Sequence, residues 1–295
     1  MGWFQEYKRG LKSAAIEELL DLVVYRPLAF LLVKAIERTP VTPNQLTLLS
    51  MVFGIIGGAF LALGGAAACA AGGVFFFLYN VVDCSDGQLA RLKHSGTHLG
   101  RILDGVADYV VSFAAYVGIG IGYATPSDTP LALWALTAAA GLSNATQSGL
   151  LDFYRNRYLE ASGVKRTAGG EEQRTFRAEF ETLRSQRGRT LEKVLVGAYV
   201  LYCRVQDRVT GGNEKESAQW NADPEGYVRA NRLIMRCWTI LGPTTQWSLL
   251  IVCGLLNRMD IYLWGIAGVG NVLAVILTIA QRWTNARLAV QGSAT

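Results

Sequence analysis

This chain of 295 residues has no cysteines at paired spacing, no internal repeat and no low-complexity tract. Its five cysteines are scattered, without the spacing of a disulfide framework or a zinc site, which predicts free thiols. The first residues are charged and lack a short apolar core that ends in small residues, so no cleaved signal peptide is expected. Together these features exclude a small domain held together by disulfides.

Long apolar runs are the main feature of the sequence. Hydrophobic residues make up 51% of the chain, and the mean hydropathy is +0.24, which is too apolar for an ordinary soluble domain. A bilayer-spanning helix needs about 20 apolar residues. The predicted fold is an all-α, polytopic integral membrane bundle with six transmembrane helices, at about 45–64, 68–92, 100–124, 130–153, 237–256 and 259–281.

Positive charge is distributed to one side of these spans. The short connections at Gly64-Gly65, Thr125–Thr129 and Asn257–Asp260 contain Arg258 as the single basic residue of the 28 in the chain. Cytoplasmic loops carry the excess of Lys and Arg, so both termini are predicted to face the cytoplasm. The net charge of +5 is then explained by basic loops, and no nucleic-acid partner is expected.

The segments outside the spans divide the chain further. Residues 1–44 predict a juxtamembrane amphipathic segment on the inner membrane surface; a helix that packs on the bundle fits the same pattern. Residues 45–283 form the predicted six-helix transmembrane domain, and 155–230 a cytoplasmic insert within it. Leu191–Val209 in that insert is amphipathic and is interpreted as an interfacial helix.

Local patterns inside the first and third spans indicate how the helices begin and pack. Thr42 followed by Pro43 is typical of a helix start. Small residues recur at four-residue spacing, a pattern that lets membrane helices approach closely: Gly54, Gly58, Gly118 and Gly122.

Four aspartates at fixed spacing lie next to apolar runs: Asp83, Asp86, Asp104 and Asp108. The first two are three residues apart at the end of one span, and the last two are four apart at the start of the next, so each pair shares a helix face. The short turn between the spans brings both pairs to the cytoplasmic side. Carboxylates at such positions are costly unless they are compensated, which predicts convergence on cations.

The chemistry of the aspartates favours hard divalent cations. Oxygen ligands select Mg²⁺, Mn²⁺ or Ca²⁺. Four carboxylates can hold two ions, which in turn bridge phosphate oxygens. Nearby residues fit a phosphate ligand, because Gly87 exposes backbone and Arg91 can donate two hydrogen bonds to phosphate. A proton or cation pathway in a transporter and a structural salt-bridge cluster are the alternatives for such acids.

The string Asp-x2-Asp-Gly-x2-Ala-Arg-x8-Gly-x3-Asp-x3-Asp is complete from Asp83 to Asp108. It resembles the signature of the CDP-alcohol phosphotransferase family, integral membrane enzymes of phospholipid synthesis. The opening of the first span, Thr42 to Thr47, is also similar to that family. The resemblance covers about 37–153 and 232–283 and does not extend to the 155–230 insert.

The resemblance implies roles for individual residues. Two cations, Mg²⁺ or Mn²⁺, would be held by Asp83, Asp86 and Asp104 and by Asp83, Asp104 and Asp108, with Asp108 also the general base. An acceptor alcohol would attack the β-phosphorus of a CDP-linked donor, and CMP would leave. A homodimer is also implied. The residues expected to contact the donor nucleotide are Gly87, Arg91 and Thr97, with Asn44 as a further contact.

The acceptor is not identified by the sequence. Arg155 and Arg232 flank the cytoplasmic ends of the fourth and fifth spans and are candidates for binding an anionic acceptor. Anchoring of the helices at the basic side of the membrane explains the same arginines. A non-catalytic cation-binding or transport protein stays open as the alternative function.

Overall fold

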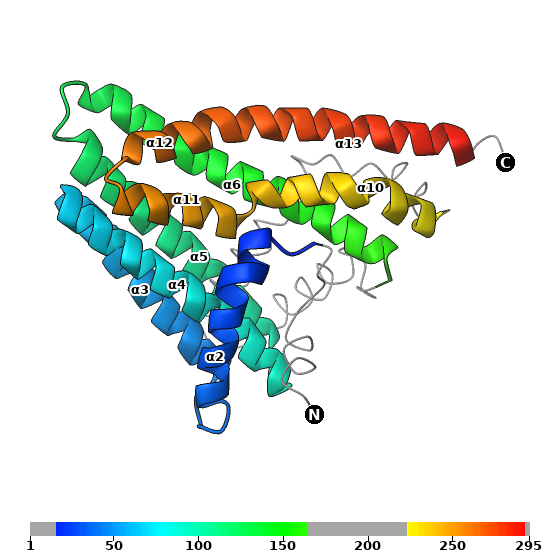
Figure 1. The fold of residues 1–295 in the computed structure, drawn as a ribbon, viewed down its shortest axis with the longest axis horizontal. Helices are drawn as coiled ribbons and strands as arrows, with labels where there is room; N and C mark the ends of the chain where they lie inside the picture. Colours follow the sequence, from blue (N-terminus) through cyan, green and yellow to red (C-terminus); the bar gives the residue numbers. More distant parts are fainter. Residues whose placement is uncertain (1–15, 164–222, 293–295) are drawn as a thin grey trace, which may run out of the picture. The chain divides into compact units, whose positions relative to one another are not determined.

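The computed structural model describes residues 16–163 and 223–292. The regular elements in these ranges are all helical (Figure 1). They are η1 (Asp21–Tyr25), α2 (Arg26–Ile36), α3 (Pro43–Leu63), α4 (Ala66–Leu92), α5 (His98–Ile119), η2 (Gly120–Ala124), α6 (Pro130–Ala161), α10 (Pro224–Trp238), η3 (Thr239–Leu241), α11 (Pro243–Leu255), α12 (Met259–Trp264), η4 (Gly265–Gly270) and α13 (Asn271–Gly292). The predicted all-α class is therefore confirmed for the described residues.

Two compact units make up the described chain, and each is described by itself. The first runs up to Gln147 and resumes over Thr239–Val272. The second contains Ser148–Trp238 and the chain from Leu273. The predicted division into 1–44, 45–283 and 155–230 stays a prediction, and the interfacial helix expected at Leu191–Val209 lies outside the described residues.

Among the described residues, four helical segments are long and apolar enough to cross a membrane: Pro43–Leu63, Ala66–Leu92, Gly100–Ala124 and Met259–Leu288. They coincide with four of the six predicted spans. The count of six is not confirmed. Over 130–153 the chain forms part of the continuous helix α6. Its apolar sequence is interrupted by polar residues, which include buried Ser143 and Gln147.

The fifth predicted span, 237–256, is divided in the structure. The short 3₁₀ turn η3 and the extended residue Gly242 separate α10 from α11. Pro243 begins α11. The proline nitrogen carries no hydrogen, so it cannot donate the backbone hydrogen bond that a helix continuing from α10 would need. The 13 residues of α11 extend about 20 Å, shorter than the roughly 30 Å of a hydrocarbon core.

The start of α3 follows the predicted cap. Thr42 Oγ1 accepts a hydrogen bond from the Gln45 backbone N at 3.4 Å, and the Gln45 side chain accepts from the Thr42 backbone N at 2.9 Å. This reciprocal capping box fixes the first turn of the helix. At its other end, Gly64 and Gly65 have φ of +69° and +78°, which L-residues rarely adopt, and they reverse the chain into α4 within two residues.

The helix α3 packs against both α4 and α5 (Figure 1). Glycines make the contact with α5 close, as the four-residue spacing predicts. A Cβ at Gly58 would lie 2.6 Å from the Ala114 carbonyl oxygen, and one at Gly118 would lie 2.2 Å from the Gly58 carbonyl oxygen. The two backbones therefore touch directly.

Replacement of Gly118 by alanine is expected to destabilise the protein, because a methyl group cannot fit against the backbone of Gly58. Overpacking of this kind costs about 1–3 kcal/mol. A thermal melt in detergent measures the effect. Gly149→Ala is the matched control, since a Cβ there meets no atom within 4 Å, and it should melt at the wild-type temperature or above. Equal melting temperatures for the two variants would contradict the close approach of α3 and α5.

The N-terminal segment packs on the same bundle. In α2 the buried side chains Ala29, Phe30 and Val33 belong to the face that contacts α4. Over these residues the segment is part of the bundle; its predicted place on the membrane surface stays a prediction. The four described cysteines outside the insert, Cys69, Cys84, Cys237 and Cys253, are free thiols, as predicted.

Candidate active site

Two helices provide the acidic side chains. Asp83 and Asp86 lie near the end of α4, and Asp104 and Asp108 lie in the early turns of α5. Thr97 caps α5, because its Oγ1 accepts a hydrogen bond from the Gly100 backbone N at 3.0 Å. The turn between the helices thus returns the chain so that the two acidic faces meet.

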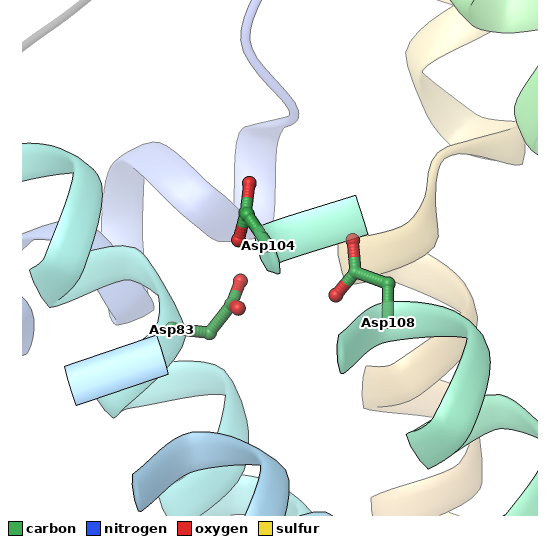
Figure 2. A group of neighbouring side chains, drawn as sticks. All are labelled: Asp83, Asp104 and Asp108. Carbon is green, nitrogen blue, oxygen red and sulfur yellow. The ribbon is translucent and has the colours of Figure 1, made fainter. Parts of the chain in front are cut away.

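Three of the four predicted acids converge. Carboxylate oxygens of Asp83, Asp104 and Asp108 all lie within 4.8 Å of one another, and their side chains point toward a common centre (Figure 2). Asp83 Oδ1 is buried and has no hydrogen-bond partner. Because a buried carboxylate oxygen is costly without a partner, this group fits a divalent cation with oxygen ligands.

Asp86 lies outside this group of three. It is 7% exposed, and its Oδ2 accepts a short hydrogen bond from Thr47 Oγ1. Thr47 belongs to α3 and is also buried, so the first span holds the fourth acid in place. Thr47 was not among the site residues predicted from the sequence, although a threonine one turn after Pro43, between Leu46 and Leu48, was the available signal.

Tyr79 is a second residue that the sequence analysis missed. Its Oη donates a hydrogen bond to Asp108 Oδ1 at 2.7 Å, which joins α4 to α5 at one of the acids. The ring is 1% exposed and packs edge-on against Trp247 of α11, with ring centroids 5.4 Å apart. Its position one turn before Asp83 was visible in the sequence, but a tyrosine in an apolar run is more often a packing residue.

The predicted donor-binding residues lie around the same turn. A Cβ at Gly87 would lie 3.3 Å from Arg91 Nη1, so the guanidinium of Arg91 folds back over the bare backbone of Gly87. A Cβ at Gly100 would lie 2.8 Å from Asn44 Oδ1, which brings the start of α3 to the start of α5. Thr97 has a local role as the cap of α5. The contacts of these residues with a nucleotide stay predictions.

The predicted acceptor-binding arginines belong to the second unit. Arg155 forms an ion pair with Asp152, with Nη1 and Oδ1 3.3 Å apart, and Arg232 is an exposed residue of α10. Since the second unit is described by itself, the role of these two arginines in binding an acceptor stays a prediction.

The acidic region lies in a part of the chain that is similar to known proteins. Residues 40–176 match the family described as CDP-alcohol phosphatidyltransferase. The chain is 30% identical over 141 residues to a bifunctional IPC transferase and DIPP synthase of Thermococcus kodakarensis. These residues are 46% of this chain and 31% of that protein. It is 32% identical over 147 residues to a phosphatidylinositol phosphate synthase of Corynebacterium glutamicum, covering 50% of this chain and 62% of that protein.

A third relative is the inner membrane protein YnjF of Escherichia coli, 33% identical over 121 residues, which cover 41% of this chain and 56% of that protein. The matched region therefore spans between about a third and somewhat over half of the length of these relatives. The apolar helices agree with an integral membrane protein. The acidic string and the convergence of its aspartates both lie within residues 40–176, the part of the chain that matches the CDP-alcohol phosphatidyltransferase family.

Proposed function

We propose that this protein transfers a substituted phosphate group from a CDP-linked donor to an acceptor alcohol and releases CMP, in phospholipid biosynthesis. The observation that carries the proposal is the convergence of Asp83, Asp104 and Asp108 within 4.8 Å, in a region that matches the family. These three acids, with Asp86 beside them, would hold two divalent cations, Mg²⁺ or Mn²⁺. Such ions neutralise the negative charge of a pyrophosphate when they are bound.

The residues of the chain perform the remaining steps. In the proposed reaction Asp108 accepts the proton of the acceptor hydroxyl as general base. The hydroxyl oxygen forms a bond to the β-phosphorus of the donor, the bond from that phosphorus to the bridging oxygen breaks, and CMP leaves with the electron pair. Tyr79 donates to Asp108 Oδ1 at 2.7 Å and so fixes the orientation of the carboxylate.

The donor nucleotide is proposed to bind at the turn between α4 and α5. Arg91 over Gly87 places a guanidinium beside open backbone, an arrangement suited to a phosphate group. Asn44 at the start of α3 lies across from Gly100 and supplies an amide to the same region. Thr97 completes the proposed donor contacts.

Orientation, acceptor and assembly are also part of the proposal. The basic residues on one side of the predicted spans favour a site and both termini on the cytoplasmic side. Arg155 and Arg232 favour an acceptor that carries an anionic group, and a homodimer is expected from the family resemblance. The Corynebacterium relative is named as a phosphatidylinositol phosphate synthase, so phosphorylated polar alcohols come first among the acceptors to test.

Purified protein incubated with a donor, an acceptor and Mg²⁺ or Mn²⁺ tests the proposal. CDP-diacylglycerol and CDP-choline are the two donor types, each combined with inositol phosphate, glycerol phosphate, serine, inositol or diacylglycerol. Formation of CMP that requires donor, acceptor and cation together is the expected result. Cation flux through proteoliposomes without CMP from any pair would instead support a transport function and overturn the proposal.

A further inference from the structure

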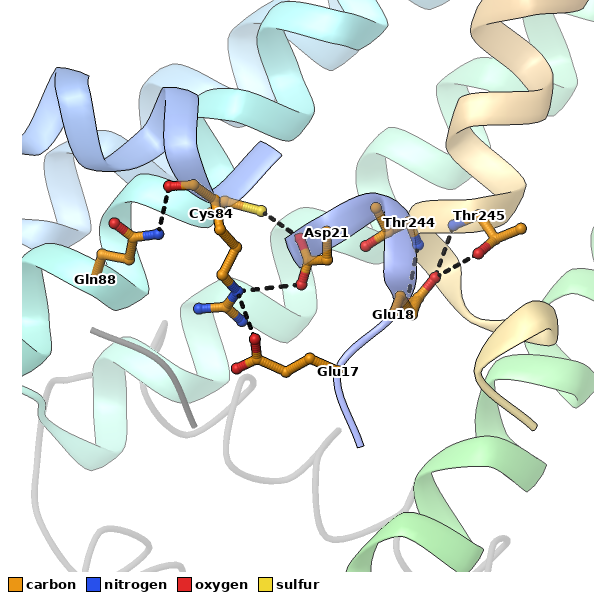
Figure 3. A network of polar contacts seen from close by, with 8 residues as sticks. Glu17, Glu18, Asp21, Cys84, Gln88, Thr244 and Thr245 are labelled. Atoms are coloured by element: carbon orange, nitrogen blue, oxygen red, sulfur yellow. Dashed lines mark hydrogen bonds and ion pairs between the residues drawn. The ribbon is translucent and has the colours of Figure 1, made fainter. Parts of the chain in front are cut away.

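A buried ion cluster joins the first residue of α2 to the chain before it. Arg26 is 8% exposed, and its Nε is 3.4 Å from Glu17 Oε2 and 3.3 Å from Asp21 Oδ2 (Figure 3). Burial lowers the pKa of Arg26, but the charges of Asp21 and Glu17 raise it, and the net shift is upward. The guanidinium therefore stays charged. Buried ion pairs contribute little net stability when compared with apolar packing, and their best-supported role is to fix one arrangement.

The ion cluster extends to the helix that carries the acidic motif. Cys84 Sγ donates to Asp21 Oδ1 at 3.2 Å, and Gln88 Nε2 donates to the backbone oxygen of Arg26 at 3.1 Å (Figure 3). Cys84 and Gln88 share one face of α4, since they are four residues apart. At about 100° per residue this face is nearly opposite to the face of Asp83 and Asp86. Asp21 and Arg26 thus contact α4 on the side away from Asp83 and Asp86.

The same segment is also attached to α11. The Glu18 carboxylate, 3% exposed, accepts hydrogen bonds from the backbone N of Thr244 at 3.3 Å and of Thr245 at 2.7 Å, and from Thr245 Oγ1 at 2.9 Å (Figure 3). A carboxylate at this position caps the helix and complements its dipole. The hydroxyls of Tyr25 and Ser248, 2.8 Å apart, form a second attachment to α11.

We propose that residues 17–26, the N-terminal strap, position the acidic motif for cation binding, with Arg26 as the central positioning residue. Arg26 gathers Glu17 and Asp21, and Asp21 sets the rotation of α4 through Cys84, the neighbour of Asp83. Groups that hydrogen-bond directly to metal ligands orient them, and their loss typically weakens metal affinity by about 10–100-fold. Arg26 would act one step further away, through Asp21 and Cys84. The inference rests on the proposed function in one respect, that the acids bind a divalent cation.

Binding of Mn²⁺ to the purified protein without substrate tests the strap, with free Mn²⁺ followed by electron paramagnetic resonance. Arg26→Gln is expected to raise the dissociation constant by about 10-fold or more, and Arg26→Lys to recover part of the loss. Arg258→Gln is the matched control, since it removes an exposed arginine that pairs with Asp260, and it should bind Mn²⁺ as the wild type does. A folded Arg26→Gln variant with wild-type affinity would overturn the proposal.

A second pair of variants tests the positioning role of the N-terminal strap if Arg26→Gln does not fold. Cys84→Ala removes only the thiol donor to Asp21 and is expected to weaken Mn²⁺ binding, whereas Cys253→Ala, a buried free thiol of α11, should not. Equal affinity in these two variants would overturn the strap. Wild-type protein that binds Mn²⁺ but forms no CMP from any donor would refute the proposed function alone, because the strap is judged on affinities.

Discussion

Asp108→Asn is expected to abolish CMP release while the helical bundle stays folded. The substitution keeps the size of the side chain and an acceptor oxygen for Tyr79, which donates to Asp108 Oδ1. It removes the proposed general base, and general-base catalysis typically contributes 10²–10⁴-fold. It also removes one of three converging carboxylates. The turnover number should therefore fall by about three orders of magnitude or more.

Timed measurement of CMP by chromatography, with a thermal melt of the same sample, checks this prediction. Tyr79→Phe is the informative companion, because it keeps the carboxylate and removes only the hydrogen bond to it. Its turnover should fall far less than that of Asp108→Asn. Asp260→Asn changes an exposed carboxylate paired with Arg258 and should leave turnover unchanged. Turnover of Asp108→Asn near the wild-type value would exclude the residue as the base.

Asp83→Asn is expected to stabilise the protein in chelator and to remove its stabilisation by Mn²⁺. Without a cation, three carboxylates within 4.8 Å repel one another. Asp83 Oδ1 is moreover buried without a hydrogen-bond partner. A neutral amide relieves the repulsion and removes a ligand at the same time. For the wild type, a cation at 100 times its dissociation constant adds about 2.7 kcal/mol to the free energy of unfolding.

Paired melts, in chelator and in Mn²⁺, give the result directly. The wild type should melt at a higher temperature with Mn²⁺, and the Asp83→Asn variant should not respond. In chelator the order of the two proteins should be reversed, with the variant more stable. If Asp83→Asn showed the full wild-type response to Mn²⁺, the carboxylates would not form the cation site.

The convergence of three of the four acids could be predicted from the sequence because it depends on local geometry. Residues three or four apart on a helix share a face, and a short turn brings Asp83 of one span near Asp104 and Asp108 of the next. Four spans followed from apolar length alone. In contrast, the apolar run over 237–256 was predicted as one span, but the structure has a helix break within it. Gly242 and Pro243 were the sequence signal for that break.

Contacts between distant parts of the chain were not accessible in this way. Thr47 reaches Asp86 over 39 positions, and Glu18 reaches Thr245 over 227. Such pairs depend on how α2, α3 and α11 pack on α4, which no local periodicity encodes. Tyr79 and Glu18 are also of residue types that serve many structural purposes, so their partners had to be seen.

The link at Gly64 and Gly65 has a consequence for motion during turnover. A connection of two residues leaves no slack, so α3 cannot slide along α4. We therefore expect Thr47 to keep its contact with Asp86 during the proposed reaction. If the site widens to admit a bulky lipid, we expect the movement in other segments, with α3 and α4 keeping their mutual packing.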